Sequence, residues 1–411
     1  MGLFGSVPHI AQYKYTMTKN VQFVLKSGKE ISIMRKHPWV FSGAIKSISG
    51  EVQEGDLVDV LSNHGDFLGT GHCQPGTIAV RMLSFSQEEI GLDFWVKKIE
   101  DAVSLRINAG LFDNQQTNVF RLINAEGDLM PGLVVDFYNG TAILQMHSVG
   151  MYLIRDLLVE ALKKVLGSKL KCVFDKSDST LPFKAGIEAK PEYLYGSSGD
   201  NSVLENGNTF FIDWEEGQKT GFFIDQRENR KLLGEYSKGR NVLNMFCYTG
   251  GFSVYAMRSG ASLVHSVDAS KKAIELTDKN VEANFKNDKR HESFAVDAFE
   301  FFNRKGTDYD LIILDPPAFA KHQKVLDNAL QGYKRINREA IEKIAKGGII
   351  FTFSCSQVVS RENFRKSVFA AAASSGRNIR ILHQLSQPAD HPISIYHPEG
   401  EYLKGLVLQV D

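Results

Sequence analysis

Polar residues that could act on a substrate follow four separate apolar runs of the sequence. Asp268 closes "SLVHSVD", Asp297 closes "HESFAVD", Asp315 closes "YDLIILD" and Cys355 closes "GGIIFTFSC". Each run has the length and the β-branched or aromatic content of a buried strand. A carboxylate can accept hydrogen bonds or transfer a proton, and a thiol becomes a nucleophile once it is deprotonated. These four positions are therefore the first candidates for a functional site.

Asp315 and Cys355 together would suit chemistry at a carbon atom of a pyrimidine base. C5 of a pyrimidine is a poor nucleophile, but a thiolate that adds to C6 makes C5 able to take a methyl group. A nearby acid must stabilise the charge that develops at N3 or N4, and Asp315 could do this. We expect the thiol of Cys355 either to have a lowered pKa or to lose its proton as the complex forms.

The alternative for Cys355 is a packing role, which is the usual one for an isolated cysteine. Its neighbours Ser354 and Ser356 are polar, and it stands where a strand ends, so we favour the nucleophile. Cys247 is the rival thiol. It lies in a turn that looks suited to a cofactor, and a packing role is expected for it.

The other two carboxylates suit the binding of a nucleoside. Asp268 lies 24 residues beyond Asn244 and could accept hydrogen bonds from both ribose hydroxyls of an adenosine. Asp297 could meet the adenine amine, or could equally cap the helix that follows it. Before these two strands, at the end of the first strand of the domain, "NMFCYTGGFS" turns at Gly250-Gly251, where backbone can approach a ligand closely. The stretch matches neither the dinucleotide nor the phosphate-loop fingerprint.

Asp315 begins the stretch "DPPAFAK". Two prolines fix the backbone there and cannot continue a strand. A rigid turn that holds a carboxylate and backbone carbonyls suits a planar base with an amino group, and Phe319 is available for stacking.

From residue 240 to the end, strand-like and helix-like stretches alternate. This alternation predicts right-handed β-α-β units in a mostly parallel sheet with helices on both faces. Two further strand-like stretches, 377–385 and 402–410, close the chain. Ligands bind outside the carboxyl ends of such strands, so the polar residues above should meet at one edge.

The pattern is different before residue 240. Residues 21–85 read as short strands separated by turn residues, the first of them 21–33, as in a small β-barrel. Residues 92–111 are predicted as a helix, 150–167 as a single amphipathic helix, and Asn139-Gly140 as a hairpin turn. We expect a leader (1–20), a β-barrel (21–90), a central α/β domain (92–195), a hairpin and linker segment (196–236) and a second α/β domain (237–411).

Composition and charge indicate which partners, metals and cellular location to expect. With 48 basic and 48 acidic residues the net charge is zero, yet residues 1–50 carry six more basic than acidic side chains. That excess could track a phosphate backbone, although a solvated face is the commoner explanation. No apolar run approaches the ~20 residues that span a bilayer, so no membrane partner is expected. The four cysteines show no metal or disulfide spacing, so we expect a cytoplasmic location and no metal.

Five strings together resemble the class I S-adenosylmethionine-dependent methyltransferases that make 5-methylcytosine in large-subunit ribosomal RNA. "RKHPWVFSGAI" resembles the start of that family's RNA-binding PUA domain, and "GQKTGFFIDQRENR" its most distinctive string. "NMFCYTGGFS" is similar to its first cofactor motif, and "LDPPAF" and "SCS" to its fourth and sixth. The resemblance implies a Rossmann-like, seven-stranded class I methyltransferase domain, preceded by a PUA barrel and a mixed α/β middle domain.

The resemblance also implies roles for particular residues. Cys355 and Asp315 would be catalytic, and S-adenosyl-L-methionine would be the cofactor. The first strand often ends in an acid in such enzymes, and Asn244 stands there instead; an amide can still hydrogen-bond the cofactor. The implied cofactor-binding residues are Lys219, Thr220, Phe222, Asp225, Arg227, Asn244, Phe246, Tyr248, Thr249, Gly250, Asp268, Asp297, Ala298 and Asp315. The implied RNA-binding residues are Arg35, Lys36, His37, Trp39, Pro317 and Phe319.

The implied partner is large-subunit ribosomal RNA, free or in an assembling particle, with a homodimer as a further candidate assembly. The target cytosine would have to leave its stack to reach Cys355. Two other functions are open at this point. An exocyclic-amine methyltransferase, acting on N6 of adenine or N4 of cytosine, could also use "DPP" and an aromatic residue. A non-enzymatic RNA-binding or ribosome-assembly factor could have kept the fold, although the intact motifs argue against it.

Overall fold

The computed structural model describes residues 21–182, 186–304, 309–320 and 322–411. The predicted leader, 1–20, lies outside the described residues. The chain divides after Glu88 into two compact units, which are taken separately below. None of the described helices is long and apolar enough to cross a membrane.

The first unit is a small β domain. Its six strands form one sheet in the order β2-β6-β5-β4-β1-β3, around a core that includes Phe23, Val58 and Val80. The strand predicted over 21–33 is wrong in its second half, because the chain turns at Gly28, whose φ is 80°, and continues as a short helix. The elements are β1 (Val21–Leu25), α1 (Ile31–Met34), β2 (Trp39–Phe41), η1 (Ser42–Ala44), β3 (Ile45–Ile48), β4 (Leu57–Leu61), β5 (Phe67–Cys73) and β6 (Ile78–Ser84).

The second unit begins with a five-stranded sheet in the order β11-β10-β9-β8-β7. The predicted hairpin is confirmed: Tyr138 pairs with Thr141, and both Asn139 and Gly140 have positive φ, as a tight two-residue turn requires. The helix predicted over 150–167 is instead two helices that meet at Ile154. The elements are α2 (Leu92–Asn108), β7 (Val119–Asn124), η2 (Ala125–Asp128), β8 (Leu133–Tyr138), β9 (Thr141–Met146), α3 (Val149–Leu153), α4 (Arg155–Leu166), η3 (Gly167–Lys169), β10 (Cys172–Asp175) and β11 (Glu192–Tyr195).

A hairpin and a helix connect this sheet to the next. The two strands of the hairpin are joined by Asn206 and Gly207, again with positive φ at both residues. The segment 212–226 then leads into a helix. The elements are β12 (Ser202–Glu205), β13 (Asn208–Phe211), η5 (Ile224–Gln226) and α5 (Arg227–Ser237).

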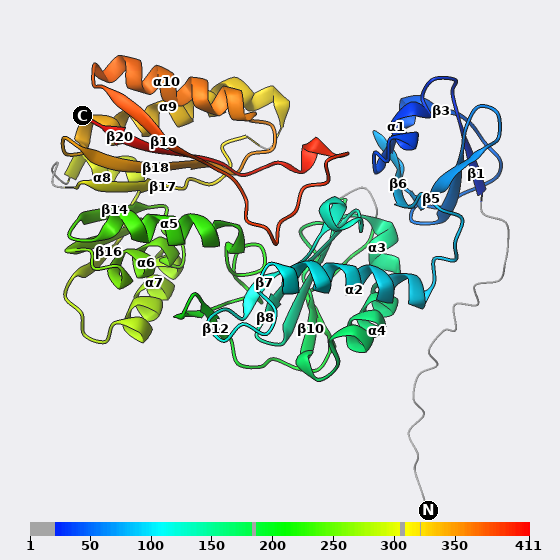
Figure 1. The fold of residues 1–411 in the computed structure, drawn as a ribbon, viewed down its shortest axis with the longest axis horizontal. Helices are drawn as coiled ribbons and strands as arrows, with labels where there is room; N and C mark the ends of the chain where they lie inside the picture. Colours follow the sequence, from blue (N-terminus) through cyan, green and yellow to red (C-terminus); the bar gives the residue numbers. More distant parts are fainter. Residues whose placement is uncertain (1–20, 183–185, 305–308, 321) are drawn as a thin grey trace, which may run out of the picture. The chain divides into compact units, whose positions relative to one another are not determined.

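The rest of the second unit is the predicted seven-stranded sheet, in the order β16-β15-β14-β17-β18-β20-β19 (Figure 1). The first five strands in this order run parallel, and β20 runs antiparallel between β18 and β19. The strands are β14 (Asn241–Met245), β15 (Leu263–Asp268), β16 (His291–Ala295), β17 (Leu311–Leu314), β18 (Gly348–Ser354), β19 (Ile379–Leu385) and β20 (Lys404–Val410). The helices are α6 (Gly251–Arg258), α7 (Lys271–Asn284), α8 (Ala298–Arg304), η6 (Gln323–Val325), α9 (Leu326–Lys343), α10 (Arg361–Ser375) and η7 (Pro398–Gly400).

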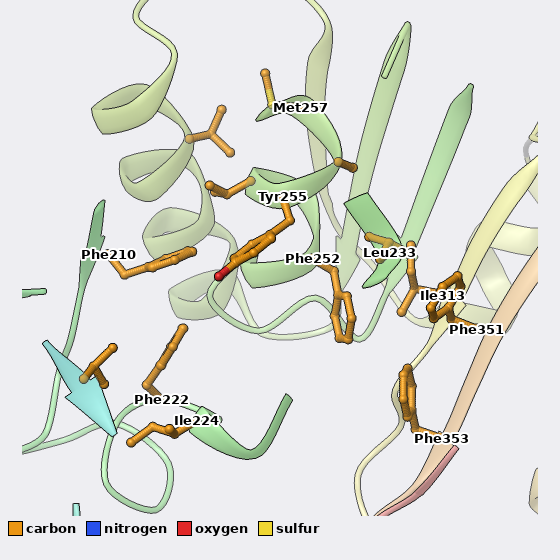
Figure 2. Close-up of a cluster of buried hydrophobic side chains, with 14 of the residues drawn as sticks. Phe210, Phe222, Ile224, Leu233, Phe252, Tyr255, Met257, Ile313, Phe351 and Phe353 are labelled. Atoms are coloured by element: carbon orange, nitrogen blue, oxygen red, sulfur yellow. The ribbon is translucent and has the colours of Figure 1, made fainter. Parts of the chain in front are cut away.

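Helices cover both faces of this sheet, as the near-continuous apolar strands require. One face packs against α5, α6 and α7, and the other against α8, α9 and α10. Figure 2 shows part of the first core, where the Phe252 and Phe353 rings lie 5.7 Å apart. The same core includes Tyr138 and Ile143 of the five-stranded sheet. The two sheets of the second unit therefore share one continuous core.

Candidate active site

The sheet order brings the predicted site residues to one edge. β17 lies between β14 and β18, so the loops that follow these three parallel strands are neighbours. Asp315 directly follows β17, and Cys355 directly follows β18. The thiol and the carboxylate are close enough for the charge of Asp315 to raise the pKa of Cys355.

Asp315 is a carboxyl group that can hold a proton near neutral pH. Burial and the neighbouring charge of Asp225 raise its pKa to about 7. Gln226 Nε2 donates a hydrogen bond of 3.1 Å to Asp315 Oδ2, which opposes that rise and fixes the carboxyl group. A carboxylic acid with this pKa is suited to general acid catalysis.

Cys355 is half-buried, and its thiol is protonated in the free protein. Burial and the charges of Asp315 and Asp225 raise its pKa to about 12, against the positive charge of Lys219. The predicted lowering of the thiol pKa is therefore wrong for the free protein, because desolvation and two carboxylates outweigh one exposed cation. The second route, loss of the proton as the complex forms, stays a prediction.

Side-chain contacts brace the two loops that carry Asp315 and Cys355. Ser356 Oγ donates to the carbonyl oxygen of Ala320, and Ser354 Oγ donates to Tyr333 of α9. The half-buried ring of Phe319 packs on the Tyr333 ring with centroids 4.7 Å apart. Pro317 is exposed. The loops are thus held by the same helix, and an aromatic face and a proline lie beside the carboxyl group.

The turn after β14 has an uncommon backbone. Phe246, Tyr248 and Gly250 have φ values of 59°, 47° and 74°, in the left-handed region. Two of the three are bulky residues, for which this conformation is strained, and such strain clusters at ligand sites. The Tyr248 N–H donates to Asp268 Oδ2 at 3.1 Å. The turn is thereby tied to the carboxylate at the end of β15.

Tyr248 also holds the segment 217–226 against this turn. Its hydroxyl accepts a hydrogen bond from the Gln218 N–H and donates one to the carbonyl oxygen of Gly221. Within that segment Asp225 Oδ2 accepts from the hydroxyl of Tyr402 at 2.8 Å. Asp225 Oδ1 is buried and has no hydrogen-bond partner among the described residues. An acceptor oxygen left open in this position is available to a ligand.

Two predicted cofactor residues of this segment, and a third at the start of α5, make internal contacts instead. Thr220 donates to Asp136 Oδ2 at 2.6 Å, and the buried Phe222 packs on Phe210, as Figure 2 shows. Arg227 makes a two-pronged ion pair with Asp390, at 2.9 and 3.0 Å. These contacts fix the segment between the two sheets; direct contact of these three residues with a cofactor stays a prediction.

We expect Arg227→Ala to lower the free energy of unfolding by about 3–5 kcal/mol, because the buried Asp390 carboxylate loses both guanidinium hydrogen bonds and keeps only His391 and the Arg121 N–H as partners. Urea denaturation followed by circular dichroism would measure this. Lys366→Ala is the matched control, since Lys366 pairs with Glu362 on the exposed face of α10. Its expected loss is below about 0.5 kcal/mol. Equal losses in the two variants would contradict the assignment of Arg227 as a buried anchor.

The remaining predicted cofactor residues line the strand ends. Asn244 Nδ2 donates to Ser253 Oγ, while its Oδ1 is buried without a partner in the described part of the chain. Thr249 and Ala298 are buried. Asp297 is exposed and accepts hydrogen bonds from the backbone N–H groups of residues 299 and 300, so it caps α8. The capping alternative for Asp297 thus has direct support, and a contact with adenine stays a prediction.

The predicted RNA-binding residues of the first unit form a basic and aromatic cluster. Arg35 and Lys36 are exposed, and the half-buried His37 and Trp39 contact one another through their rings at 6.2 Å. The guanidinium of Arg81 lies 5.4 Å from the Trp39 ring centre. Cations and aromatic faces together are what a nucleic-acid surface needs.

Sequence reasoning missed Gln226, Tyr402 and Lys404, which the structure brings to the site. Gln226 lies inside the distinctive string "GQKTGFFIDQRENR" and could have been singled out there. Tyr402 and Lys404 come from the last strand-like stretch, far along the chain from Cys355. The signal for Lys404 was a charged residue at the start of an apolar strand.

Comparison with known proteins places the chain in a family. A family model described as S-adenosylmethionine-dependent methyltransferase matches residues 181–395, and a PUA-like domain model matches residues 23–85. The chain belongs to the S-adenosylmethionine-dependent methyltransferase family.

Its relatives match it over nearly their whole length. The chain is 39% identical over 397 residues to the ribosomal RNA large subunit methyltransferase I of Alteromonas mediterranea, covering 95% of this chain and 99% of that one. It is 38% identical over 394 residues to the protein of the same name from Tolumonas auensis, with 94% and 98% covered. A solved structure of a candidate SAM-dependent methyltransferase from Streptococcus mutans has a TM-score of 0.80 at 24% identity, with 95% and 100% covered, and shows the likeness of the fold.

The described residues fit the cofactor that this family uses. The left-handed turn 246–250 presents backbone groups, and a side chain at Gly250 would approach Thr277 to 2.7 Å, so the turn cannot be filled by a larger residue. Asp268 has lone pairs beyond its bonds to Tyr248 and Ser270. The open oxygens of Asn244 and Asp225 add two buried acceptors. When bound, S-adenosylmethionine supplies an electrophilic methyl group.

Proposed function

We propose that this protein methylates C5 of a cytosine in large-subunit ribosomal RNA, through a transient covalent bond between Cys355 and C6 of the base. The observation that carries the proposal is the adjacency of a thiol and a proton-bearing carboxyl group at the ends of β17 and β18. The names of the relatives support large-subunit ribosomal RNA as the substrate.

The two side chains have complementary roles in this proposal. The sulfur of Cys355 adds to C6, and the protonated Asp315 donates toward N3, where negative charge develops. Protonation of Asp315 also removes a negative charge beside the thiol. Protonated Asp315 therefore favours the thiolate form of Cys355. C5 then becomes able to accept a methyl group, and loss of the C5 proton expels the sulfur.

The base would reach the site by leaving its stack. Pro317 and the half-buried ring of Phe319 are proposed to contact the flipped base, because a rigid apolar edge and a ring suit a planar ligand. Arg35, Lys36, His37 and Trp39 are proposed to bind surrounding RNA through phosphate contacts and stacking.

The cofactor is proposed to bind at the turn 246–250, at Asp268 and at Asp225. We expect Asp268→Ala to weaken S-adenosylmethionine binding about 10- to 100-fold, since hydrogen bonds to a charged group contribute about 1.5–3 kcal/mol. Isothermal titration calorimetry would measure this. Asp200→Ala is the matched control, because Asp200 accepts from the backbone N–H two residues ahead just as Asp268 does. Unchanged affinity in Asp268→Ala would rule out the carboxylate as a ribose ligand.

The domain boundaries, the cellular location and the oligomeric state are also proposals. We propose domain boundaries at 21–90, 92–195, 196–236 and 237–411. A cytoplasmic location is supported by four cysteines that are all free thiols. A homodimer is tested by light scattering of the purified protein.

The test of the proposed function identifies the methylated nucleoside. Purified protein is incubated with labelled S-adenosylmethionine and large-subunit RNA, both naked and as precursor particles, and the RNA is digested to nucleosides. We expect the label in 5-methylcytidine. Label in N4-methylcytidine or N6-methyladenosine would replace the proposal with exocyclic-amine methylation. Absence of label in every form of the substrate would favour the non-enzymatic alternative.

A further inference from the structure

Lys404 is a buried lysine beside the candidate nucleophile. It is the first residue of β20, and the antiparallel pairing of β20 with β18 sets it opposite Ser354. Its side chain is 2% exposed. Nζ donates a hydrogen bond of 2.6 Å to the carbonyl oxygen of Ser356. The amino group therefore contacts the backbone on the far side of Cys355, while the Lys404 backbone pairs on the near side.

This burial is unusual for a lysine. Buried ammonium groups are costly unless a carboxylate compensates them. Within the described residues no carboxylate lies within ion-pair distance of Lys404 Nζ, although Asp315 and Asp225 lie near the adjoining thiol. A lysine kept in such a place without an ion-pair partner is a candidate for a chemical role.

Burial favours the neutral amine of Lys404, whereas two of the three charged groups around it favour the ammonium form. Burial lowers its pKa to about 8, while Cys355 and Glu401 oppose this and Arg361 adds to it. Arg361 and Glu401 form an ion pair with one another, so their effects largely cancel. Cys355 is the strongest of the charges that act to raise the pKa of Lys404. The two side chains are thus coupled to each other.

In the addition step of the proposed reaction, the proton of the Cys355 thiol has no assigned acceptor. Cys355 must lose its proton, yet Asp315 has to keep its own to act as an acid, and both Asp315 and Asp225 disfavour a thiolate. Lys219 contributes a positive charge from an exposed position, where it is solvated. Among the groups that surround the thiol, the neutral fraction of Lys404 that a pKa of about 8 provides is the one that can take a proton and become a favourable counter-charge.

We propose that Lys404 accepts the proton of the Cys355 thiol as the sulfur attacks C6. The S–H bond breaks, the proton joins the lone pair of Nζ, and the sulfur electron pair forms the S–C6 bond. The π electrons of C5=C6 move toward N3, which takes the Asp315 proton. After methyl transfer, solvent water takes the C5 proton, and the electron pair of that C–H bond re-forms C5=C6 as the S–C6 bond breaks. The ammonium of Lys404 then returns its proton to the sulfur, and N3 returns its proton to Asp315. This step rests on the proposed function of Cys355.

The first test measures the reactivity of Cys355 itself. Alkylation by iodoacetamide is followed from pH 6 to pH 10 by mass spectrometry of the Cys355 peptide, since the other three cysteines are buried. Lys404→Met is expected to slow alkylation at pH 8 at least tenfold and to move the inflection to higher pH. Lys366→Met, on the exposed face of α10, should match the wild type. A Lys404→Met profile that superimposes on the wild-type profile would overturn the proposal.

The second test separates proton transfer from charge alone. Lys404→Arg keeps a long cationic side chain, but a guanidinium cannot accept a proton. Both Lys404→Met and Lys404→Arg should reduce single-turnover methyl transfer at least tenfold while S-adenosylmethionine binding is kept. Wild-type transfer by Lys404→Arg would show that only the charge matters and would overturn the proton step. The alkylation profile does not depend on which nucleoside is methylated, so failure of the proposed function is recognised separately.

Discussion

Asp315→Asn is expected to lower the rate of methyl transfer by about 10²-fold or more and, at the same time, to stabilise the folded protein. An asparagine keeps the shape of the side chain and can still accept the hydrogen bond from Gln226. It cannot deliver a proton toward N3, and general acid catalysis typically contributes 10²- to 10⁴-fold. The loss should appear in single-turnover rates, with S-adenosylmethionine affinity measured alongside.

The stabilisation follows from the raised pKa of Asp315. Folding moves this pKa from its ordinary 3.8 to about 7, so the folded state holds the proton more tightly than the unfolded state. The cost of the ionised group therefore grows as pH rises from about 4 and is complete above pH 7. At 1.36 kcal/mol for each pKa unit, Asp315→Asn should raise the free energy of unfolding by about 2–4 kcal/mol at pH 8.

Urea denaturation of the wild type and of Asp315→Asn at two pH values tests this directly. At pH 5, Asp315 of the folded wild type is protonated. The stabilisation by Asp315→Asn should therefore be less than about half of its value at pH 8. A destabilised variant at pH 8, or a gain that does not change with pH, would show that Asp315 is not a strained carboxylate. Full activity in Asp315→Asn would remove the acid from the mechanism.

Cys355→Ala is expected to abolish methyl transfer, with a loss of at least about 10³-fold, while cofactor binding is unchanged. C5 cannot be activated without the bond from sulfur to C6, so no slower version of the same route remains. The change removes one half-buried sulfur atom and therefore leaves the core of β18 in place.

Cys247→Ala is the matched control for this prediction. Cys247 is also a thiol near the cofactor turn, but it is buried, its pKa is raised by that burial, and its sulfur lies 3.6 Å from Thr277 Oγ1. Its replacement should cost stability and leave most of the activity. The proposal is contradicted if the two variants exchange these roles, or if Cys355→Ala retains methyl transfer.

Much of the fold could be predicted because its signals are local. Apolar runs that alternate with amphipathic helices predicted the parallel sheet, and Asn139-Gly140 predicted a hairpin that the structure contains. Errors arose where local signals were weak. The lysines and glycine after Leu25 turn the chain, so residues 31–34 became a helix. The break at Ile154 interrupts a helical pattern that the sequence carries without interruption.

The residues that meet at the carboxyl ends of the strands could also be predicted. The ion-pair and hydrogen-bond partners of each side chain could not. Asp315 and Cys355 follow from strand ends and from sheet order. The ion pair of Arg227 with Asp390 joins residues 163 positions apart, and no local pattern indicates it. Lys404 reaches the site because β20 returns antiparallel beside β18, which periodicity cannot predict. Side-chain roles that depend on such long-range pairing require the structure.

The covalent bond between Cys355 and C6 can be observed most directly with RNA that contains 5-fluorocytidine. Fluorine at C5 cannot leave as a proton does, so a methylated adduct should persist. With S-adenosylmethionine present, the wild type and Cys247→Ala should each give a protein–RNA band that survives denaturing electrophoresis, with the RNA attached to the Cys355 peptide. Cys355→Ala should give none. A protein that converts cytidine to 5-methylcytidine yet forms no such band, or forms it through another residue, would contradict the proposed mechanism.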